Sequence, residues 1–135
     1  MKKNLLFITI ILFITACDKP SGEGGTSKIS GNVTYFTTSY NAQTNVLDTV
    51  FYPKANKDVY IIYSDNENDI FDDKTETDWN GNFHFQYLRK GDYIIYTYVD
   101  SIVVNTINYD YPVFKHVVIS ENNSDLILDS FIINK

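Results

Sequence analysis

The chain contains one cysteine, Cys17, among 135 residues. A single thiol cannot close an intramolecular disulfide, so the domain that follows must be stabilised by packing and strand pairing. Long hydrophobic runs are also missing. The apolar run from Leu5 to Ile14 has ten residues, about half of the ~20 that a membrane-spanning helix needs. This length argues against a spanning helix.

Basic residues are scarce, with 11 Lys and Arg against 17 Asp and Glu. Removal of the two lysines that precede the apolar run would leave nine basic residues against 17 acidic ones, a net charge of −8. A basic face for phosphate groups is therefore not expected, and nucleic acid is a poor candidate partner. The domain's own surface is not expected to adhere to anionic lipid either.

The first seventeen residues hold two lysines, the apolar run, and then Ala16 directly before Cys17. This order of charge, apolar core and small residue is typical of a secretion signal. With a cysteine at the cleavage point it resembles a bacterial lipoprotein signal, which implies that residues 1–16 are removed and that Cys17 carries lipid. Ile14 stands where such signals usually have Leu. A plain secretory signal and a membrane-spanning anchor are the alternatives.

The lipoprotein resemblance implies attachment to a membrane of the bacterial cell envelope, which we take to be the outer membrane. Asp18, directly after the cysteine, leaves open both retention at the inner membrane and which face of the outer membrane the domain occupies. Residues 18–27 contain Gly, Ser and Pro but no apolar side chain. We therefore predict that residues 17–27 form the lipidated cysteine and a flexible tether. Residues 28–135 then form a single domain.

Helical periodicity is not found after Cys17. Alternating and short apolar segments between Gly, Asn and Asp clusters predict strands instead. Asn80-Gly81, between two alternating segments, predicts a hairpin. The fold class predicted is all-β, a single antiparallel immunoglobulin-like or prealbumin-like sandwich of about seven to eight strands. The eight candidate strands are 29–35, 46–52, 58–63, 70–77, 82–88, 92–102, 111–120 and 125–133.

The middle of the chain has the spacing T-x-T-D-x-x-G-x-F-x-F-x-x-L-x-x-G-x-Y. Its residues are Thr75, Thr77, Asp78, Gly81, Phe83, Phe85, Leu88, Gly91 and Tyr93. This spacing is similar to the carboxypeptidase regulatory-like domains and to the related transthyretin-like and collagen-adhesin B-type sandwiches. The resemblance implies structural roles: Gly81 and Gly91 in turns, the phenylalanines and Leu88 in the core, and a Tyr93 hydroxyl bonded to backbone. It implies no particular function.

An acidic stretch from Asp65 to Glu76 has oxygens spaced as in a calcium loop, with Asp65, Glu67 and Asp69 as candidate ligands. Ile70 occupies the position where such loops need Gly, and no helices flank the stretch. The alternative is a solvated acidic loop followed by an edge strand. Calcium is therefore the one cofactor considered.

His84 and His116 are the only two histidines. A two-histidine metal site across the sheet and two separate outward histidines are both open interpretations. For catalysis, no serine lies in a G-x-S-x-G elbow. The enzymatic branch of the transthyretin-like family uses His and Arg residues with a C-terminal Tyr-Arg-Gly-Ser. Here Arg89 is the sole arginine and lies in a turn, which argues against that enzyme.

Aromatic residues supply candidate binding groups. Trp79, at the tip of the predicted hairpin, is the candidate binding residue, since exposed aromatics anchor sugars and protein partners. Tyr96 and Tyr98 share one face of a strand with Ile94, and Tyr109 and Tyr111 lie in an apparent insertion; the alternative for the strand tyrosines is a core role. Asp48-Thr49-Val50 and Asp100-Ser101-Ile102 resemble short O-glycosylation motifs.

Together these patterns predict a lipid-anchored, non-enzymatic β-sandwich module of the cell envelope. Its partner would be an envelope protein or a glycan. The alternatives are an adhesion-type domain stabilised by calcium and a small hydrolase.

Overall fold

The computed structural model describes residues 19–104 and 107–134, without the side chains of residues 100–109. All regular structure in these residues is β-strand, and they hold no helix able to span a membrane. The strands form two sheets, which confirms the predicted all-β sandwich. Cys17 and the signal peptide lie outside the described residues. The strands are β1 (Glu23–Asn41), β2 (Val46–Pro53), β3 (Asp58–Ile62), β4 (Asp73–Glu76), β5 (Asn82–Leu88), β6 (Gly91–Val104), β7 (Ile107–Ile119), β8 (Asp125–Ile127) and β9 (Phe131–Asn134).

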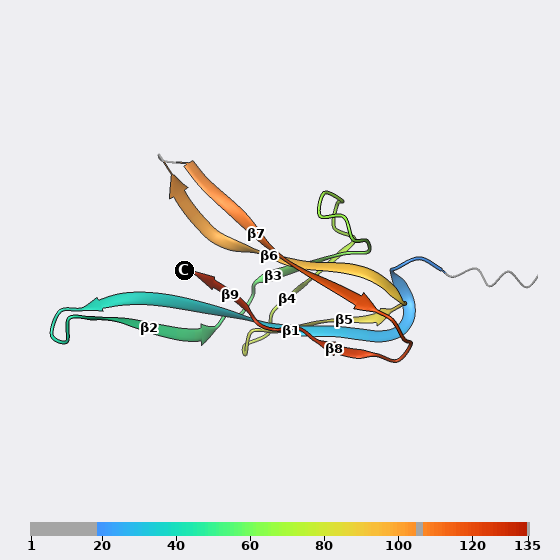
Figure 1. Cartoon of the computed structure of the whole chain (residues 1–135), viewed down its shortest axis with the longest axis horizontal. Coiled ribbons are helices and arrows are strands. Elements are labelled where there is room, and N and C mark those ends of the chain that lie inside the picture. Colours follow the sequence, from blue (N-terminus) through green and yellow to red (C-terminus); the bar gives the residue numbers. More distant parts are fainter. Residues whose placement is uncertain (1–18, 105–106, 135) are drawn as a thin grey trace, which may run out of the picture.

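The long strand β1 organises the first sheet (Figure 1). The Val33 N–H donates to the Gly81 carbonyl at 2.8 Å, and the Val33 carbonyl accepts from the Lys54 N–H at 3.0 Å. Both groups of one strand residue point to the same side, so β5 and β2 lie end to end along one edge of β1. Strands β8 and β9 pair with the other edge, both parallel to β1. The second sheet is antiparallel, in the order β4-β3-β6-β7.

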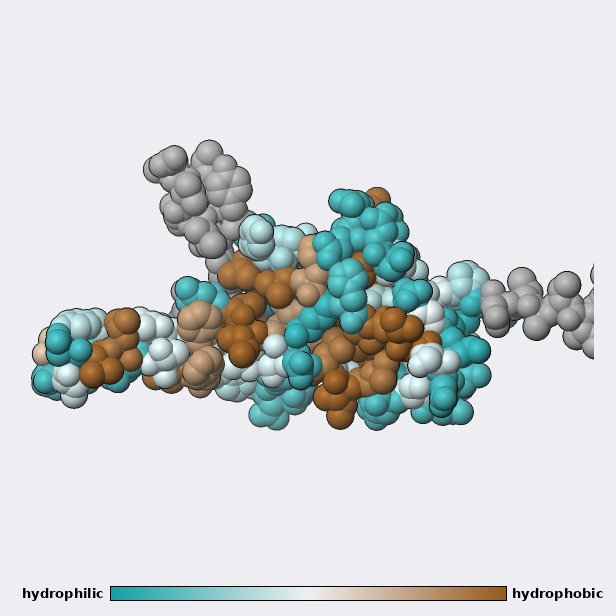
Figure 2. All heavy atoms as spheres, viewed as in Figure 1, coloured by the Kyte–Doolittle hydropathy of each residue, from teal (hydrophilic) through white to brown (hydrophobic). Residues whose placement is uncertain are grey.

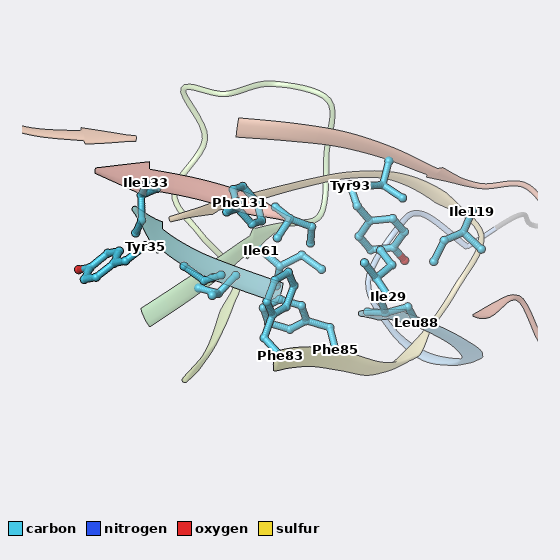
Figure 3. Close-up of a cluster of buried hydrophobic side chains, with 14 residues drawn as sticks. Ile29, Tyr35, Ile61, Phe83, Phe85, Leu88, Tyr93, Ile119, Phe131 and Ile133 are labelled. Atoms are coloured by element: carbon cyan, nitrogen blue, oxygen red, sulfur yellow. The ribbon is translucent and has the colours of Figure 1, made fainter. Parts of the chain in front are cut away.

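Alternate residues of both sheets fill the space between them (Figure 3). Phe83 and Phe85 of β5 contact each other with ring centroids 6.2 Å apart, and both are buried, as predicted. Leu88 is buried with them. The core is made of Ile29, Val33, Tyr35, Val59, Ile61, Phe83, Phe85, Leu88, Tyr93, Ile95, Val117, Ile119, Phe131 and Ile133.

The end of β5 departs from its alternation. The alternation of the segment 82–88 predicts Tyr87 on the same side as Phe83 and Phe85, and this prediction is wrong, because Tyr87 is 70% exposed. Its φ is +60°, in the left-handed region. That conformation reverses the alternation for one residue and lets the following Leu88 enter the core in its place.

The predicted last strand, 125–133, is two strands. The inward side chains change parity along this segment, from Leu126 and Leu128 to Phe131 and Ile133. A continuous strand keeps one parity on one face, so the chain must leave the sheet between β8 and β9. This break raises the number of strands to nine and introduces the two parallel pairings.

The predicted hairpin at Asn80-Gly81 is also wrong. Strand β4 pairs with β3 and strand β5 pairs with β1, so the turn between them connects the two sheets. The Asp78 carboxylate accepts from the N–H groups of Asn80 and Asn82, each at 2.8 Å. Gly81 takes a φ of +77°. Turn residues of this type therefore mark a reversal here without marking a strand pair.

Strand β4 is shorter than the predicted 70–77. The N–H of Asp72 donates to the Ile61 carbonyl at 2.9 Å, and its carboxylate accepts from the Tyr63 N–H at 2.7 Å. These bonds close residues 63–72 into a loop, and the strand begins only at Asp73. Of the predicted insertion at 103–111, residues 103–104 belong to β6 and residues 107–111 to β7, and these two strands pair with each other.

The predicted tether is wrong for the described residues 20–27. Strand β1 begins at Glu23, and Ser27 is 1% exposed. The Gly22 N–H donates to the buried Tyr93 hydroxyl at 2.9 Å, and that hydroxyl donates to the Arg89 carbonyl at 2.7 Å. The predicted backbone bond of Tyr93 is therefore confirmed. Composition failed here because this segment is held by hydrogen bonds, which need no apolar side chains.

Arg89 completes this N-terminal clamp, which we define as residues 20–25 held by Arg89 and Tyr93. Its guanidinium donates to the Pro20 carbonyl at 2.8 Å and also reaches the Glu23 carbonyl. The Arg89 N–H donates to the Gly22 carbonyl at 2.9 Å. A side chain at Gly25 would overlap the Leu88 carbonyl oxygen, so close approach of the two backbones requires glycine at this position.

Candidate functional site

The outer surface of the second sheet carries a row of rings. Tyr60 of β3 lies opposite Tyr96 of β6, which in turn lies opposite Phe114 of β7. Residues that lie directly opposite each other project from the same face of a sheet, so three strands contribute one ring each. We call the whole cluster the outer aromatic face; its members are Tyr60, Phe71, Tyr96, Tyr98 and Phe114.

The rings pack tightly against one another. Tyr60 and Tyr96 stack with centroids 4.9 Å apart and planes 16° apart. Tyr98 meets both rings edge-on, with centroids 5.7 Å away in each case. Ile62 and Ile94 are buried in the same cluster. The face is therefore a formed apolar platform whose rings are already oriented, and it is only half covered at Tyr60, Tyr98 and Phe114.

Burial raises the pKa of two hydroxyls of the platform. Burial raises the pKa of Tyr96 to about 12, with a further contribution from neighbouring Tyr98. The pKa of Tyr60 is also raised, first by burial and then by the Asp58 carboxylate. Both hydroxyls are neutral hydrogen-bonding groups at ordinary pH.

A hollow of about 290 Å³ opens at one end of the outer aromatic face. Its lining joins two tyrosines of the platform to a polar rim from the loop before β3. The residues that line it are Lys54, Asn56, Lys57, Asp58, Tyr60 and Tyr98. Apolar ring faces and charged or amide groups thus meet around one small space, which is the usual make-up of a site for a small polar ligand.

Asp58 is the centre of the polar rim. Its carboxylate accepts from the Tyr60 hydroxyl at 3.3 Å and from the Lys74 ammonium at 3.2 Å. The same pairing raises the pKa of Lys74. The Thr97 hydroxyl donates to the Asp58 carbonyl at 2.8 Å, which fixes the backbone at this position. The carboxylate is thus held beside the ring that a ligand would contact.

A larger hollow, of about 570 Å³, lies over β1 and β5 on the other sheet. Residues such as Lys28, Asn82 and Gln86 line it beside Ile127. The tyrosines of the platform belong to the opposite sheet, so this hollow has no pair of half-buried rings along one wall. We therefore place the candidate site at the smaller hollow.

The structure separates the three predicted calcium ligands. The Glu67 carboxylate lies 2.8 Å from the ring of His116. The Asp69 carboxylate accepts from Ser64 and Asn66 within the loop. Within residues 19–104 and 107–134, no three His, Cys, Asp or Glu side chains are grouped as a metal ion requires. Calcium binding through Asp65, Glu67 and Asp69 has no support from this geometry and stays an untested prediction.

The two histidines lie in different sheets, His84 on β5 and His116 on β7. Both are exposed on the outer side of their strands. A shared two-histidine metal site is therefore excluded by the topology, and the interpretation as separate outward histidines is correct. His116 instead ties the 63–72 loop across the second sheet through its contact with Glu67.

The other candidate aromatics have different settings. Trp79 lies at the turn between the sheets and is 86% exposed, as predicted. Its role in binding remains a prediction. Tyr111 is exposed on β7. Tyr109 and Asp100–Ile102 lie where side chains are not described. Thr49, in the other glycosylation motif, is exposed on β2, and its modification is untested.

Sequence reasoning found Tyr96 and Tyr98 but missed their partners. Tyr60 belongs to the segment DVYIIY, two residues after Asp58, so the two side chains are expected on the same face of the strand. That spacing could have predicted a carboxylate beside an aromatic ring. Phe114 could be added only once the β6–β7 register was known. Phe71 reaches Tyr60 from the loop, with ring centroids 5.0 Å apart, and no sequence pattern predicts that contact.

The fold and this face define the class: a small all-β sandwich with an aromatic platform on one outer surface. No protein-family model matches the chain, and no curated protein matches it. Among solved structures, the chain is similar to a protein of Pseudomonas aeruginosa for which carbohydrate binding has been suggested. The TM-score is 0.47 and the identity 16%, over 85% of this chain and 92% of that one.

Proposed function

We propose that the chain is a non-enzymatic, lipid-anchored binding module of the bacterial cell envelope, and that its ligand is a glycan held at the outer aromatic face. One observation supports this above the others: Tyr60 and Tyr98 form one wall of a hollow whose remaining wall is polar. Sugars have apolar C–H faces and hydroxyl edges, so they need both kinds of surface side by side.

In this proposal a pyranose ring packs its C–H face on the exposed part of the tyrosine wall. Its hydroxyls then donate to the Asp58 carboxylate and bond to the Asn56 amide, which also lines the hollow. Asp58 is already held by Tyr60 and Lys74, so a ligand meets a fixed acceptor. A fixed site lowers the entropy lost on binding.

The lipid anchor is supported by the residues before the domain. Pro20 is held by Arg89, and only Asp18 and Lys19 separate it from Cys17. Three residue steps span at most roughly 11 Å. A lipid on Cys17 would therefore keep the clamped end of the sandwich next to the bilayer surface. Labelled fatty acid supplied to cells would enter the wild-type chain and would not enter a Cys17→Ser variant.

The binding proposal is tested on a glycan array with the mature chain in detergent. Tyr98→Ala should weaken binding to the recognised glycan by about tenfold or more, as loss of a stacking ring does at a central contact. Asp58→Asn should weaken it less. Trp79→Ala is the matched control, because it removes an exposed aromatic away from the hollow, and it should bind as wild type.

Either of two outcomes overturns the glycan proposal. The first is an array on which wild type recognises no glycan. The second is a Trp79→Ala chain that loses binding while Tyr98→Ala retains it, which would move the site to the turn between the sheets. Circular dichroism of each variant separates loss of binding from loss of fold.

A further inference from the structure

A two-stranded ribbon extends beyond the sandwich. Strand β9 pairs with β1 only as far as Phe36, and beyond this residue the described strands give β1 a single partner, β2. We call residues 37–50 the arm; Figure 1 shows it reaching away from the two layers. An isolated two-stranded hairpin is at best marginally stable in water, so a partner strand would stabilise it considerably.

The arm is more apolar than a solvated ribbon needs to be. Tyr40, Val46, Leu47 and Val50 are 54–64% exposed, and Phe51 at its base is 58% exposed. Figure 2 shows brown, apolar patches on this ribbon among teal and white residues. Scattered apolar residues are normal on a protein surface, but a group of them on a protruding strand indicates an interaction surface.

The outer edge of β2 is open among the described strands, since β2 ends the order of its sheet. The Lys54 N–H points to β1, so even-numbered residues of β2 point their backbone groups inward and odd-numbered ones point outward. Leu47, Thr49 and Phe51 therefore offer their N–H and C=O groups along the open edge. Pro53 takes the next outward position and has no N–H, which ends the usable edge there.

We propose that this edge pairs with the β2 edge of a second copy of the chain, antiparallel and centred on Thr49. In this register Leu47 faces Phe51 of the other copy, and Asp48 faces Val50. Outward residues meet outward residues, so the backbone hydrogen bonds are formed in the correct phase. An aliphatic side chain beside an aromatic one is a favourable cross-strand pair.

The two neighbouring registers would give a less stable strand pair. Centring the pair on Asp48 opposes the two Asp48 carboxylates, and like charges directly opposite each other are destabilising. Centring it on Val50 places Leu47 opposite Pro53, which removes a donor from the ladder. Only the Thr49 register separates the carboxylates and uses all three outward residues. This self-complementarity favours a second copy over an unrelated strand as the occupant.

The first test measures the oligomeric state of the mature chain by sedimentation, in a Cys17→Ser background that carries no lipid or thiol. Wild type at this edge should form a dimer. Thr49→Pro should raise the dimer dissociation constant by about tenfold or more, because it removes outward N–H donors without touching the β1–β2 ladder. Thr49→Ala is the matched control and should dimerise as wild type does. A wild-type chain that stays monomeric overturns the proposal.

The second test fixes the register and does not depend on dimer affinity. Asp48→Cys and Val50→Cys chains, each in the Cys17→Ser background, are oxidised alone and as a mixture. Facing residues of a non-hydrogen-bonded pair have Cα atoms about 4.5 Å apart, which suits a disulfide. The mixture should therefore form far more covalent dimer than either variant alone. Equal yields from the single variants, or a covalent dimer through Gln43→Cys at the arm's tip, would contradict the register.

Discussion

The two ends of β1 are stabilised in opposite ways. At its start, the N-terminal clamp bonds the carbonyls of Pro20 and Gly22, and the Gly22 N–H, to Arg89 and Tyr93. At its end, residues 37–41 of β1 pair with β2 alone among the described strands, and the arm that they form leaves apolar side chains in solvent. One strand thus runs from a region with dense tertiary bonding to a region that has none beyond its own hairpin.

Whether a segment of this chain is buried therefore depends on its position in the fold more than on its amino-acid composition. The clamp is rich in Gly, Ser and Pro, and it is buried at Gly22. The arm carries Tyr40, Val46, Leu47 and Val50, and all four are exposed. Local opening should accordingly be frequent in the arm and rare in the clamp.

The largest effect should come from filling the closest contact of the clamp. Gly25→Ala places a methyl group against the Leu88 carbonyl oxygen. The methyl carbon and the carbonyl are both attached directly to the backbone, so the clash can be relieved only by moving a strand. We expect a loss of about 3 kcal/mol in unfolding free energy, at the upper end for overpacking. Urea unfolding measures it. Ala42→Gly, in the arm's turn, is the contrasting change and should cost less than about 1 kcal/mol; comparable losses would contradict the comparison.

The next largest effect should be a loss of stability at alkaline pH that comes from Tyr96 in the outer aromatic face. The folded pKa of Tyr96 is about 12 against an unfolded value of 10.0, so the folded chain holds this proton more tightly. Stability from this group is complete below pH 10 and is lost as pH rises from 10 to 12. The full loss is on the order of 2 kcal/mol.

Urea unfolding at pH 9 and pH 11.5 measures this alkaline loss. Tyr96→Phe should reduce the fall between the two values, since the variant has no hydroxyl to titrate at that position. A variant whose stability falls as steeply as that of wild type would show that Tyr96 does not carry the effect.

A comparable effect should come from removing one oxygen in the clamp. Tyr93→Phe leaves the Gly22 N–H without its acceptor in a buried place. An orphaned buried donor costs about 1–3 kcal/mol. Hydrogen exchange should show faster exchange at residues 22–27. Tyr40→Phe, the matched change at the exposed end of the same strand, should leave both stability and exchange at those residues unchanged.

Much of the fold could be predicted because alternation reports burial directly. The spacing and the family resemblance it carries predicted Phe83 and Phe85 in the core, and both are buried. Hydrogen-bonded structure without apolar side chains gives no such signal, which is why residues 20–27 were misassigned. The Asn80-Gly81 turn failed for another reason: turn chemistry specifies a reversal and does not specify which strands pair afterwards.

The candidate site was predictable only in part. Tyr96 and Tyr98 are two residues apart in one strand, so the sequence alone places them on the same face. The hollow needs β3 beside β6 and the loop before β3 folded back to Tyr98, and those contacts join residues about forty positions apart. The calcium spacing counts oxygens along the chain and carries no information on where the folded loop directs them. In the folded loop, Glu67 turns to His116 and Asp69 turns to Ser64.

The smallest effect on stability should come from the arm itself. Leu47→Lys replaces a side chain that is 64% exposed, so the monomer loses little burial, and we expect a change within about 0.5 kcal/mol. The same substitution places a charge opposite Phe51 in the proposed dimer and should weaken association. Unfolding of the dilute monomer and sedimentation of the concentrated chain measure the two effects separately. A large loss in the monomer would mean that the arm is held by the sandwich, and the contrast between the two ends of β1 would then be wrong.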